Sequence, residues 1–555
     1  MSSEKYEIGS RAECEKMVKD WGFPHVFTWT DSRRMSLPGI LRLPTEILVS
    51  IFEFQDLQDC GSVPNIRLTC QRFCALSSHL LIRKVYVDIT QQETIDRLQS
   101  IVADAGLAKG VREVYLRVHF YHPWVAASFE KFTASIESEW KQRTSSRNYY
   151  EQDQQQGSVW DFERIAWNFI RSLDRTVAGD ASHHEMERQS TGNDADTRTS
   201  CIIRPSLVLQ RAYKLYKAGY ESQDGIMRNR SFTSVLSKTL FKFKDLSRVI
   251  IYDRELNNNY DPGMTICVPR EDCTGQTDAL VSVFSRPMVW EDAQWIEPSE
   301  EIRAGVPIQL LVEIPIAIGQ THGLMISNLH IQVTAAPDYA RLPTDPETLG
   351  ILSAAIKQME LFQFSFKPCC ASGCGPWRAS DDWGEIRGAN GKSATELQAL
   401  GEYLGAILDC DSIKHAEINL GEFWMGAGFD SIDRVPTSLG TSWFHASAGI
   451  RSLDLRQVPL TTADLERFIT EALADEEVEI SLLDVYLWNG TWKQILESPR
   501  MAKRKNMKIR LKDPLGGGLG ELDQEAYSLV FDQLTDHASM AEQYIRGEID
   551  RNPLE

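Results

Sequence analysis

The residues that could bind a metal occur in two short groups. His184-Glu185 begins the H-E-x-x-H pattern of zinc hydrolases, but Arg188 stands where the second histidine is needed. The three cysteines within residues 369–374 lack the paired C-x-x-C spacing and the downstream histidines of structural zinc sites. We therefore predict no metal site in this chain.

The residues that could hold phosphate or act as catalytic acids are equally incomplete. Residues 514–520 (PLGGGLG) lack the Lys-Ser/Thr pair of a phosphate-binding loop, so we expect a turn there. Asp381-Asp382 are adjacent acids in a glycine-rich stretch, which favours a solvated surface over a general acid–base pair. The sequence also lacks a G-x-S-x-G motif. From these motifs we predict no catalytic residue and no cofactor.

Length and composition indicate the kind of protein in which these residues lie. The chain has 555 residues and a mass of 63.0 kDa, which exceeds one ordinary hydrophobic core, so we expect two or more domains. The 59 basic and 78 acidic residues give a net charge of −19, which argues against nucleic-acid binding. Hydrophobic residues make up 42% of the chain, which indicates a folded protein rather than a disordered one.

Cysteine use and hydropathy indicate the compartment. Eleven cysteines without regular spacing are typical of reduced, intracellular thiols. The first residues (MSSEKYEIGSRAEC) are charged and contain no apolar signal segment. The most apolar stretch, residues 305–319, is shorter than the ~20 apolar residues of a membrane span and contains Glu313. We expect a cytoplasmic or nuclear protein that does not bind membranes.

Patterning along the chain divides it into four parts. Residues 1–36 are a polar N-terminal extension, and residues 37–90 form a compact, strongly patterned block. Residues 91–515 form the largest part, with a flexible insertion predicted near residues 174–200, where large apolar residues are almost absent. Residues 516–555 are predicted to be a C-terminal helical tail. The apolar residues with helical spacing in this tail are Ala526, Leu529, Val530 and Leu534.

The block at residues 37–90 carries the most specific pattern. Pro44 and Glu46 are both favoured at a helix start, because the N–H that proline lacks is not needed there and the helix dipole attracts an anion. The apolar face of this first helix consists of Ile47, Leu48, Ile51 and Phe52. A second predicted helix contains Ile66, Leu68, Cys70 and Phe73. A third apolar set then leads into an alternating strand over residues 85–89.

This block has more large apolar side chains than three short helices can bury. A unit of about 45 residues is close to the lower limit for an independent core. Apolar surface that stays exposed on so small a module indicates a docking site for a protein partner. The alternative is that residues 47–52 pack against the domain that follows.

The same block resembles an F-box. The resemblance is carried by LPTEIL at residues 43–48, by IF at residues 51–52, and by the apolar residues at positions 68, 70 and 73. It implies a non-catalytic substrate receptor of an SCF-type cullin–RING ubiquitin ligase. The F-box would bind a Skp-family adaptor and, through it, a cullin scaffold, while the rest of the chain would capture an unknown protein substrate.

Carried over residue by residue, the resemblance divides the apolar residues of the block into two groups. Those expected to face the adaptor are Leu43, Pro44, Ile47, Leu48, Ile51 and Phe52. Those expected to be shared between the F-box core and the adaptor interface are Ile66, Leu68, Cys70 and Phe73.

A pattern of apolar-x-x-apolar-x-apolar recurs in the rest of the chain. Its copies begin at Val111, Leu246, Ile326, Met359, Ile413, Ile450 and Ile480. Chance supplies about 40 such matches at this composition, so the pattern has weight only where helical stretches separate the copies. Two such stretches follow the last two copies: one begins at Thr461 with acidic Asp464 in a capping arrangement, and the other places Trp492, Ile495 and Leu496 on one face.

Strand–helix units that repeat in this way bury their faces by stacking into a solenoid. Residues 450–469 and 482–498 also resemble the degenerate leucine-rich repeats of fungal F-box proteins. The predicted fold is therefore of the α+β or α/β class: a small three-helix F-box followed by an irregular leucine-rich-repeat-like α/β solenoid. A layered α/β domain is the alternative. Trp424, Trp443 and Trp488 lie in or near the repeats, and we expect most of them to pack between units.

Two rival functions stay open at the level of sequence. The first is an F-box-bearing scaffold for protein interactions that is not linked to degradation. The second is an enzyme whose active site lies in residues 200–390, the least clearly patterned region. A deep polar pocket with converging titratable groups in that region would favour the enzyme.

Overall fold

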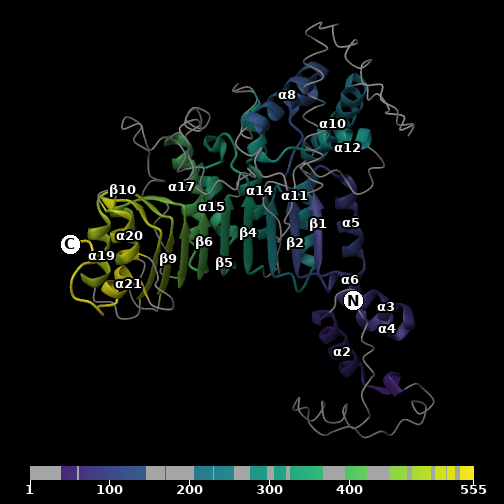
Figure 1. Ribbon diagram of the computed structural model, residues 1–555. Helices are drawn as coiled ribbons and strands as arrows, with labels where there is room; N and C mark the ends of the chain where they lie inside the picture. Colours follow the sequence, from purple (N-terminus) through teal and green to yellow (C-terminus); the bar gives the residue numbers. More distant parts are fainter. Residues whose placement is uncertain are drawn as a thin grey trace, which may run out of the picture. The chain divides into compact units, whose positions relative to one another are not determined.

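The computed structural model describes residues 39–58, 62–145, 169, 205–228, 231–254, 276–296, 305–320, 326–366, 394–421, 449–471, 478–501, 507–519, 522–531 and 538–555. The chain divides into two compact units, Met1–Leu80 and Leu81–Glu555 (Figure 1). This boundary precedes the predicted end of the patterned block at residue 90, because Lys84–Asp88 is strand β1 of the second unit. The predicted insertion at residues 174–200 lies outside the described residues.

Short helices make up the described part of the first unit. They are η2 (Gly39–Arg42), α2 (Thr45–Gln58), α3 (Ser62–Thr69), α4 (Gln71–Ser77) and η3 (Ser78–Leu80). The second predicted helix is thus two helices, and the physical reason is Cys70. Its backbone is extended (φ −163°, ψ 161°), and its Sγ accepts a hydrogen bond from the N–H of Phe73 at 3.5 Å. Cys70 therefore caps α4 instead of continuing α3.

The second unit is organised around a parallel sheet. Nine of the described strands follow one another across it in chain order, and each pairs in parallel with its neighbours (Figure 1). After β1 they are β2 (Glu113–Arg117), β3 (Arg248–Tyr252), β4 (Asn328–Val333), β5 (Leu361–Phe366), β6 (His415–Asn419), β7 (Ser452–Arg456), β9 (Val478–Leu483) and β11 (Met507–Lys512). The fold is therefore mixed α/β, with the helices of the first unit in addition.

The recurring apolar pattern forms the buried ladder of this sheet. The last two apolar residues of each copy pair in register with those of the next strand and are buried, except in the last copy. In the copy that begins at Ile480, the residues in register are Ile480 and Leu482, and the buried Val485 follows the strand. Leu483 points to the opposite face of the sheet, because side chains alternate along a strand.

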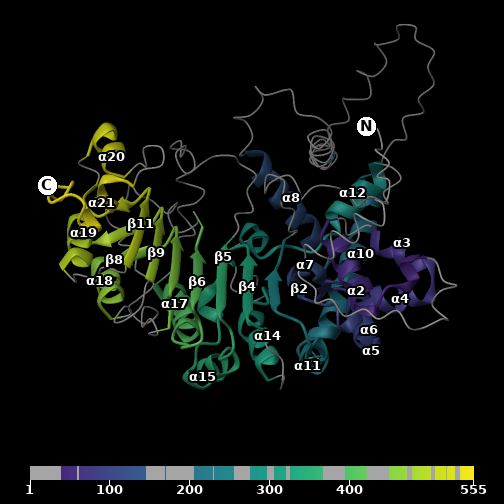
Figure 2. The ribbon, with the colours of Figure 1, turned by 90° about the horizontal axis from the view of Figure 1, so that it is seen from below.

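Helices cover one face of the sheet. They include α5 (Gln92–Ala103), α11 (Ser231–Thr239), α14 (Leu310–Gly319), α15 (Pro346–Ala355) and α17 (Ala394–Leu408). Each of these packs against the next in this order, and Figure 2 shows α11, α14, α15 and α17 side by side along the sheet. Their buried residues join the strand ladder in one continuous apolar cluster. No described helix combines the length and the apolarity that crossing a membrane requires.

A second group of helices lies beyond the carboxyl ends of β2 and β3 (Figure 1). It consists of α7 (Pro123–Ala127), α8 (Phe129–Ser145), α10 (Pro205–Arg228), α12 (Gln276–Phe284) and η8 (Trp290–Trp295). Long-range hydrogen bonds attach it: Trp290 Nε1 donates to the carbonyl of Val118 at 2.8 Å, and the N–H of His122 donates to the Tyr216 hydroxyl at 2.8 Å. The shorter helices of the unit are α6 (Ala105–Ala108), η6 (Leu240–Lys242) and η9 (Tyr339–Arg341).

The C-terminal strands share a repeated turn. After β7, β9 and β11, a single residue has a left-handed φ: Gln457 (53°), Asp484 (52°) and Asp513 (50°). The chain then enters β8 (Pro459–Thr461), β10 (Tyr486–Asn489) and β12 (Leu515–Gly516), which form a small second sheet. The predicted glycine-rich turn follows β12, where Gly516, Gly517 and Gly518 all have positive φ. The chain therefore changes direction in the same way after each of β7, β9 and β11.

The helices that follow β8 and β10 begin with the same kind of cap. In α18 (Thr462–Glu471) the predicted cap is confirmed, because Thr461 Oγ1 bonds Asp464 Oδ2 at 2.6 Å and accepts from the N–H of Asp464 at 3.1 Å. In α19 (Trp492–Met501) Thr491 and Gln494 form the equivalent box.

The C-terminal tail contains two helices in the described residues, α20 (Gln524–Phe531) and α21 (Met540–Ile545). The predicted apolar stripe of this tail is only partly buried. Val530 is buried, but Leu529 is 56% exposed. Leu534 lies outside the described residues.

Candidate protein-binding sites

Five apolar residues form the core of the first unit. Leu48, Phe52, Val63, Phe73 and Leu80 are at most 8% exposed and lie in one cluster. The rings of Phe52 and Phe73 meet edge to face, with their centroids 5.0 Å apart. Leu48 and Phe52, expected to face the adaptor, thus lie in the unit's own core together with Phe73, which was expected to be shared between core and interface.

The other predicted residues lie around this core. Those that pack partly against it are Leu43, Ile51, Ile66 and Cys70. Pro44 and Ile47 are also partly buried. Leu68 is different, because 85% of its surface is exposed on α3, and Ile40 is 46% exposed at the start of the unit. Among the side chains of this module that the structure describes, Leu68 is therefore the large apolar one that is almost fully open.

Arg72 fixes the segment that precedes α2. From α4, its Nη1 donates to the carbonyl of Leu41 at 2.5 Å and its Nη2 donates to the carbonyl of Leu43 at 2.9 Å. Two charge-assisted bonds to carbonyls hold the entry of α2 in one position. The sequence analysis missed Arg72, because its partners are main-chain atoms far along the chain and no side-chain pattern marks them.

Residues 40–84 match the F-box domain. This segment covers the described helices of the first unit from Ile40 onward and ends at the first residue of β1. The chain carries an F-box. F-boxes are protein-interaction modules that typically bind Skp-family adaptors in ubiquitin ligases, and proteins that carry them are usually non-catalytic. No curated protein matches the chain.

The open surface of the F-box is suited to an apolar partner. Burying a leucine side chain contributes about 1.5–3 kcal/mol relative to leaving it in water. Leu68 can gain nearly all of that on contact with a partner, because its side chain has almost no contact within the F-box. Leu48 and Phe52 cannot gain this burial energy from a partner, because they are already buried.

The sheet face opposite the helices offers polar side chains in hydrogen-bonded rows. Arg248 Nη2 donates to Gln363 Oε1 at 3.4 Å, and Gln363 Nε2 donates to Glu417 Oε2 at 2.9 Å. Arg456 Nη2 lies 3.9 Å from Glu417 Oε1. These contacts cross from β3 to β7 and stabilise the neighbouring strands against one another. The middle of this face therefore presents charges that are already neutralised by their neighbours.

A buried polar cluster closes the carboxyl ends of β1 and β2. His119 Nε2 lies 2.9 Å from Asp88 Oδ1, and Thr90 Oγ1 donates to the same oxygen at 2.6 Å. Burial opposes ionisation of Asp88, but the facing His119 and the hydrogen bonds from Thr90 outweigh it and lower the pKa of Asp88 to about 2. Thr90 Oγ1 also lies 3.2 Å from His119 Nε2, so the three buried side chains bond one another and join the two strand ends.

A second buried carboxylate joins β3 to the helices above it. Asp253 accepts hydrogen bonds from the N–H of Trp290 at 2.9 Å and from the N–H and the hydroxyl of Thr334 at 3.0 and 2.5 Å. Burial raises the pKa of Asp253 although these bonds act in the opposite direction. Neither Asp253 nor Thr334 was marked by the sequence, because each is an ordinary polar residue directly after a strand.

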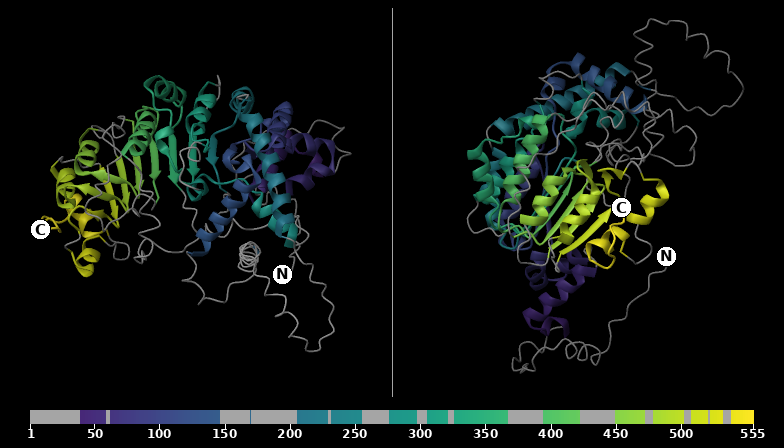
Figure 3. Two further views of the ribbon diagram at one scale, coloured as in Figure 1. Left: turned by 90° about the horizontal axis from the view of Figure 1, so that it is seen from above. Right: turned by 90° about the vertical axis from the view of Figure 1, so that its left-hand side faces the viewer.

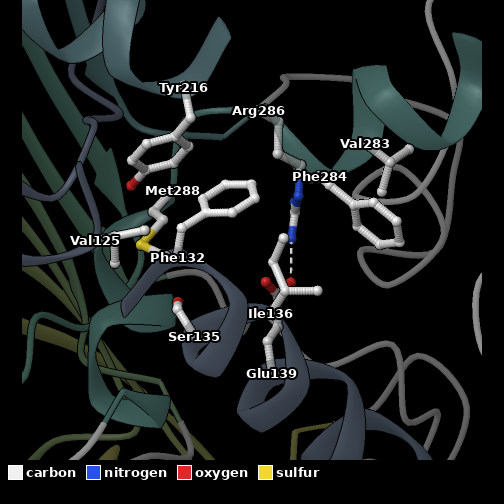
Figure 4. Close-up of a pocket in the computed structure, with 10 residues that line it drawn as sticks. All are labelled: Val125, Phe132, Ser135, Ile136, Glu139, Tyr216, Val283, Phe284, Arg286 and Met288. Atoms are coloured by element: carbon white, nitrogen blue, oxygen red, sulfur yellow. Dashed lines mark hydrogen bonds and ion pairs between the residues drawn. The ribbon is translucent and has the colours of Figure 1, made fainter. Parts of the chain in front are cut away.

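A pocket among α8, α10 and α12 tests the rival enzyme hypothesis (Figure 4). Its lining residues are Val125, Phe132, Ser135, Ile136, Glu139, Tyr216, Val283, Phe284, Arg286 and Met288. Most are apolar or aromatic, and Arg286 Nη2 pairs with Glu139 Oε1 at 2.5 Å. This arrangement is an ion pair among apolar walls rather than a set of converging titratable groups.

Most of the other residues considered from sequence lie outside the part of the chain that the structure describes. Residues 184–188, 369–374 and 381–382 lie outside the described residues, as do Trp424 and Trp443. In the part of the chain that the structure describes, three or more metal-binding side chains never come together. Trp492 is fully buried, and its Nε1 donates to the carbonyl of Leu515 at 3.0 Å, so it packs between units as expected.

Proposed function

We propose that the chain is the substrate-binding subunit of an SCF-type cullin–RING ubiquitin ligase that works in the cytoplasm or nucleus. The observation that carries this proposal is the match of residues 40–84 to the F-box domain, which coincides with a compact helical unit that has its own core. In this role the F-box binds a Skp-family adaptor and, through it, a cullin. Leu68, 85% exposed, supplies an apolar contact of the F-box to that adaptor.

We assign the capture of a protein substrate to the second unit, as an irregular leucine-rich-repeat-like solenoid. Three features support this assignment. The strands follow one another in chain order, the helices lie on the outer side of the bent sheet (Figure 3), and the left-handed turn recurs at Gln457, Asp484 and Asp513. Stacked strand–helix units of this kind leave one sheet face open for partners.

The mechanism is proximity. A substrate held on the second unit stays near the ubiquitin-charged enzyme of the ligase, which raises the effective concentration of its lysines. Residues of this chain then need only bind and position. The satisfied ion pairs of the sheet face and of the helical pocket agree with such a role.

Co-purification with a Skp-family adaptor tests the F-box assignment. We expect the intact chain to retain the adaptor and Leu68→Glu to lose it, since a carboxylate would then be buried in an apolar contact. Leu529→Glu is the matched control, because Leu529 is also an exposed helical leucine but lies in α20 of the other unit. The double variant Leu43→Ala with Pro44→Ala should also lose the adaptor. Binding by Leu68→Glu equal to that of the control would contradict the proposal.

Cullin-dependent ubiquitination separates the receptor from a scaffold. We expect a protein that co-purifies with the intact chain to be ubiquitinated in the reconstituted ligase, and we expect Leu68→Glu to abolish the modification. An F-box that binds the adaptor while every co-purifying protein stays unmodified would instead favour a scaffold that is not linked to degradation.

A further inference from the structure

We propose that Asn489 is a site of spontaneous deamidation, and that the isoaspartate it yields loosens the start of α19. The reacting pair is Asn489-Gly490, which connects β10 to α19. The reaction is intramolecular, because the main-chain nitrogen of Gly490 attacks the side-chain carboxamide of Asn489. Two features of the turn lead to this proposal: both reacting groups are accessible and unbonded, and the packing of the turn requires glycine.

Both reacting groups lie at the surface. Asn489 is the last residue of β10, and it and Gly490 are exposed. Among the residues that the structure describes, neither the carboxamide of Asn489 nor the N–H of Gly490 has a hydrogen-bond partner. The register between β10 and β8 also shifts between Leu487 and Asn489, so the regular ladder is interrupted just before the pair. The nitrogen and the carboxamide can therefore approach each other without losing a hydrogen bond of their own to this part of the chain.

Packing against α18 requires glycine at position 490. Its φ is 87°, a left-handed value that residues with a side chain rarely adopt. A Cβ at this position would also collide with Thr462 Oγ1. Glycine has no side chain that could shield its main-chain nitrogen. The packing that excludes other residues from this position therefore also leaves the attacking atom accessible.

The chemistry has two steps. In the first, the N–H of Gly490 loses its proton, its nitrogen bonds to Cγ of Asn489, and the carboxamide nitrogen takes up the proton and leaves as ammonia. In the second, water opens the cyclic imide. Cleavage between the nitrogen and Cγ gives aspartate, whereas cleavage between the nitrogen and the main-chain carbonyl carbon gives isoaspartate, in which the main chain runs through the former side chain.

Asn419 is the internal comparison. It ends β6 as Asn489 ends β10, but its Oδ1 accepts a hydrogen bond from the N–H of Gly421 at 2.9 Å. The residue that follows it is Leu420, whose side chain is buried. An engaged carboxamide followed by a bulky residue is not expected to form the imide, so Asn419 should stay intact.

The product acts on contacts at both ends of the turn. The main-chain carbonyl of Asn489 accepts a hydrogen bond from Thr462 Oγ1 at 2.7 Å, which attaches β10 to the first turn of α18. Thr491 and Gln494 cap α19 directly after the turn. Isoaspartate lengthens the main chain between these contacts by one carbon atom, so they are no longer held in register. Aspartate keeps the chain length, and a negative charge near a helix N-terminus is favourable.

Peptide mass mapping of the full chain tests the site. After long incubation at mildly alkaline pH, we expect Asn489 to gain the mass difference between an amide and an acid. Conversion should slow at mildly acidic pH, because the attacking nitrogen must lose a proton, and Asn489→Gln should abolish it. Asn390-Gly391, outside the described residues, is the same residue pair and reports the reaction in this chain. An unconverted Asn489, most clearly beside a converted Asn390, or equal conversion of Asn419 would overturn the site.

Hydrogen exchange tests the consequence for α19. Electron-transfer fragmentation identifies the isoaspartate form, in which the amides of residues 492–496 should exchange about fivefold faster, as expected for the loss of one helix cap. Asn489→Asp is the matched control, because it introduces the charge without lengthening the chain, and its exchange there should equal that of the unchanged protein. Unchanged exchange in the isoaspartate form, or an equal acceleration in Asn489→Asp, would overturn the effect on α19.

Discussion

The F-box and the sheet unit bury their apolar residues on very different scales. The F-box core has five buried apolar residues, whereas the buried residues of the sheet unit form one cluster through its strands and covering helices. Its helices α3 and α4 have only eight and seven residues, and isolated helices of fewer than about 12 residues are marginal in water. The stability of the F-box therefore depends on each core side chain, whereas the stability of the sheet unit comes from many buried side chains.

The largest expected effect follows from this difference. Truncation of a buried phenylalanine costs about 3–5 kcal/mol. A unit of about 45 residues has a stability of about 2–7 kcal/mol, so Phe73→Ala should unfold much of the F-box population. Phe364→Ala in β5 removes an equally buried ring from the sheet unit, which should remain folded. Hydrogen exchange measured on the full chain, with peptides from residues 45–77 and 361–366, distinguishes the two units.

Leu68→Ala is the control for this comparison, because Leu68 is exposed and its truncation should leave exchange in the F-box unchanged. An F-box that keeps its protection in Phe73→Ala would show that the unit does not depend on its five-residue core. Loss of protection at residues 361–366 in Phe73→Ala would show that the two units unfold together.

The features that the sequence predicted correctly are local ones. The start of α2, the cap at Thr461 and the apolar face of α19 each depend on residues within one or two helical turns. The recurring apolar pattern also marked most strands, because a half-buried strand has a period of two. In β9, LLDV offers more than one way to place apolar residues at that period, and pairing with β7 and β11 sets Ile480 and Leu482 in the ladder.

The features that the sequence did not predict are contacts between distant residues. Arg72 bonds carbonyls before α2, and Asp253 bonds Thr334 just after the next strand, β4. The order of the strands is of the same kind, because β2 and β3 pair although a group of helices lies between them in sequence. The exposure of Leu68 and the burial of Phe52 also follow from the way the helices pack, since both fit the same apolar pattern.

The two units also differ in how their polar contacts respond to pH. In the F-box, the acceptors of Arg72 are main-chain carbonyls, which do not titrate. In the sheet unit, the folded-state pKa of Asp88 is lowered from 3.8 to about 2, so its ionised form stabilises the fold by roughly 2 kcal/mol. That contribution is fully present above pH ~4 and is lost as pH falls through about 2. Acid should therefore weaken the sheet unit at this cluster while leaving the Arg72 contacts in place.

Asp88→Asn measures this contribution directly. At pH 7 we expect the variant to lose roughly 2 kcal/mol in the free energy of unfolding of the sheet unit, and the difference from the unchanged chain should shrink between pH ~4 and ~2. Denaturant unfolding at several pH values provides the measurement. Asp96→Asn is the control, because Asp96 is exposed on α5. A difference that stays constant over that range would mean that Asp88 does not act through its charge.

The smallest expected effects on the free energy of unfolding concern helix caps, which occur in both units. Thr461→Ala and Thr491→Ala each remove a hydroxyl that caps α18 or α19, at a cost of about 1 kcal/mol. Cys70→Ala removes the cap of α4, but a thiol is a weak acceptor and its contact with the N–H of Phe73 is 3.5 Å long, so a few tenths of a kcal/mol are expected. Urea unfolding of the three variants measures these losses in the free energy of unfolding. A loss in Cys70→Ala equal to that in the threonine variants would show that even this weak cap is needed in a unit with so small a core.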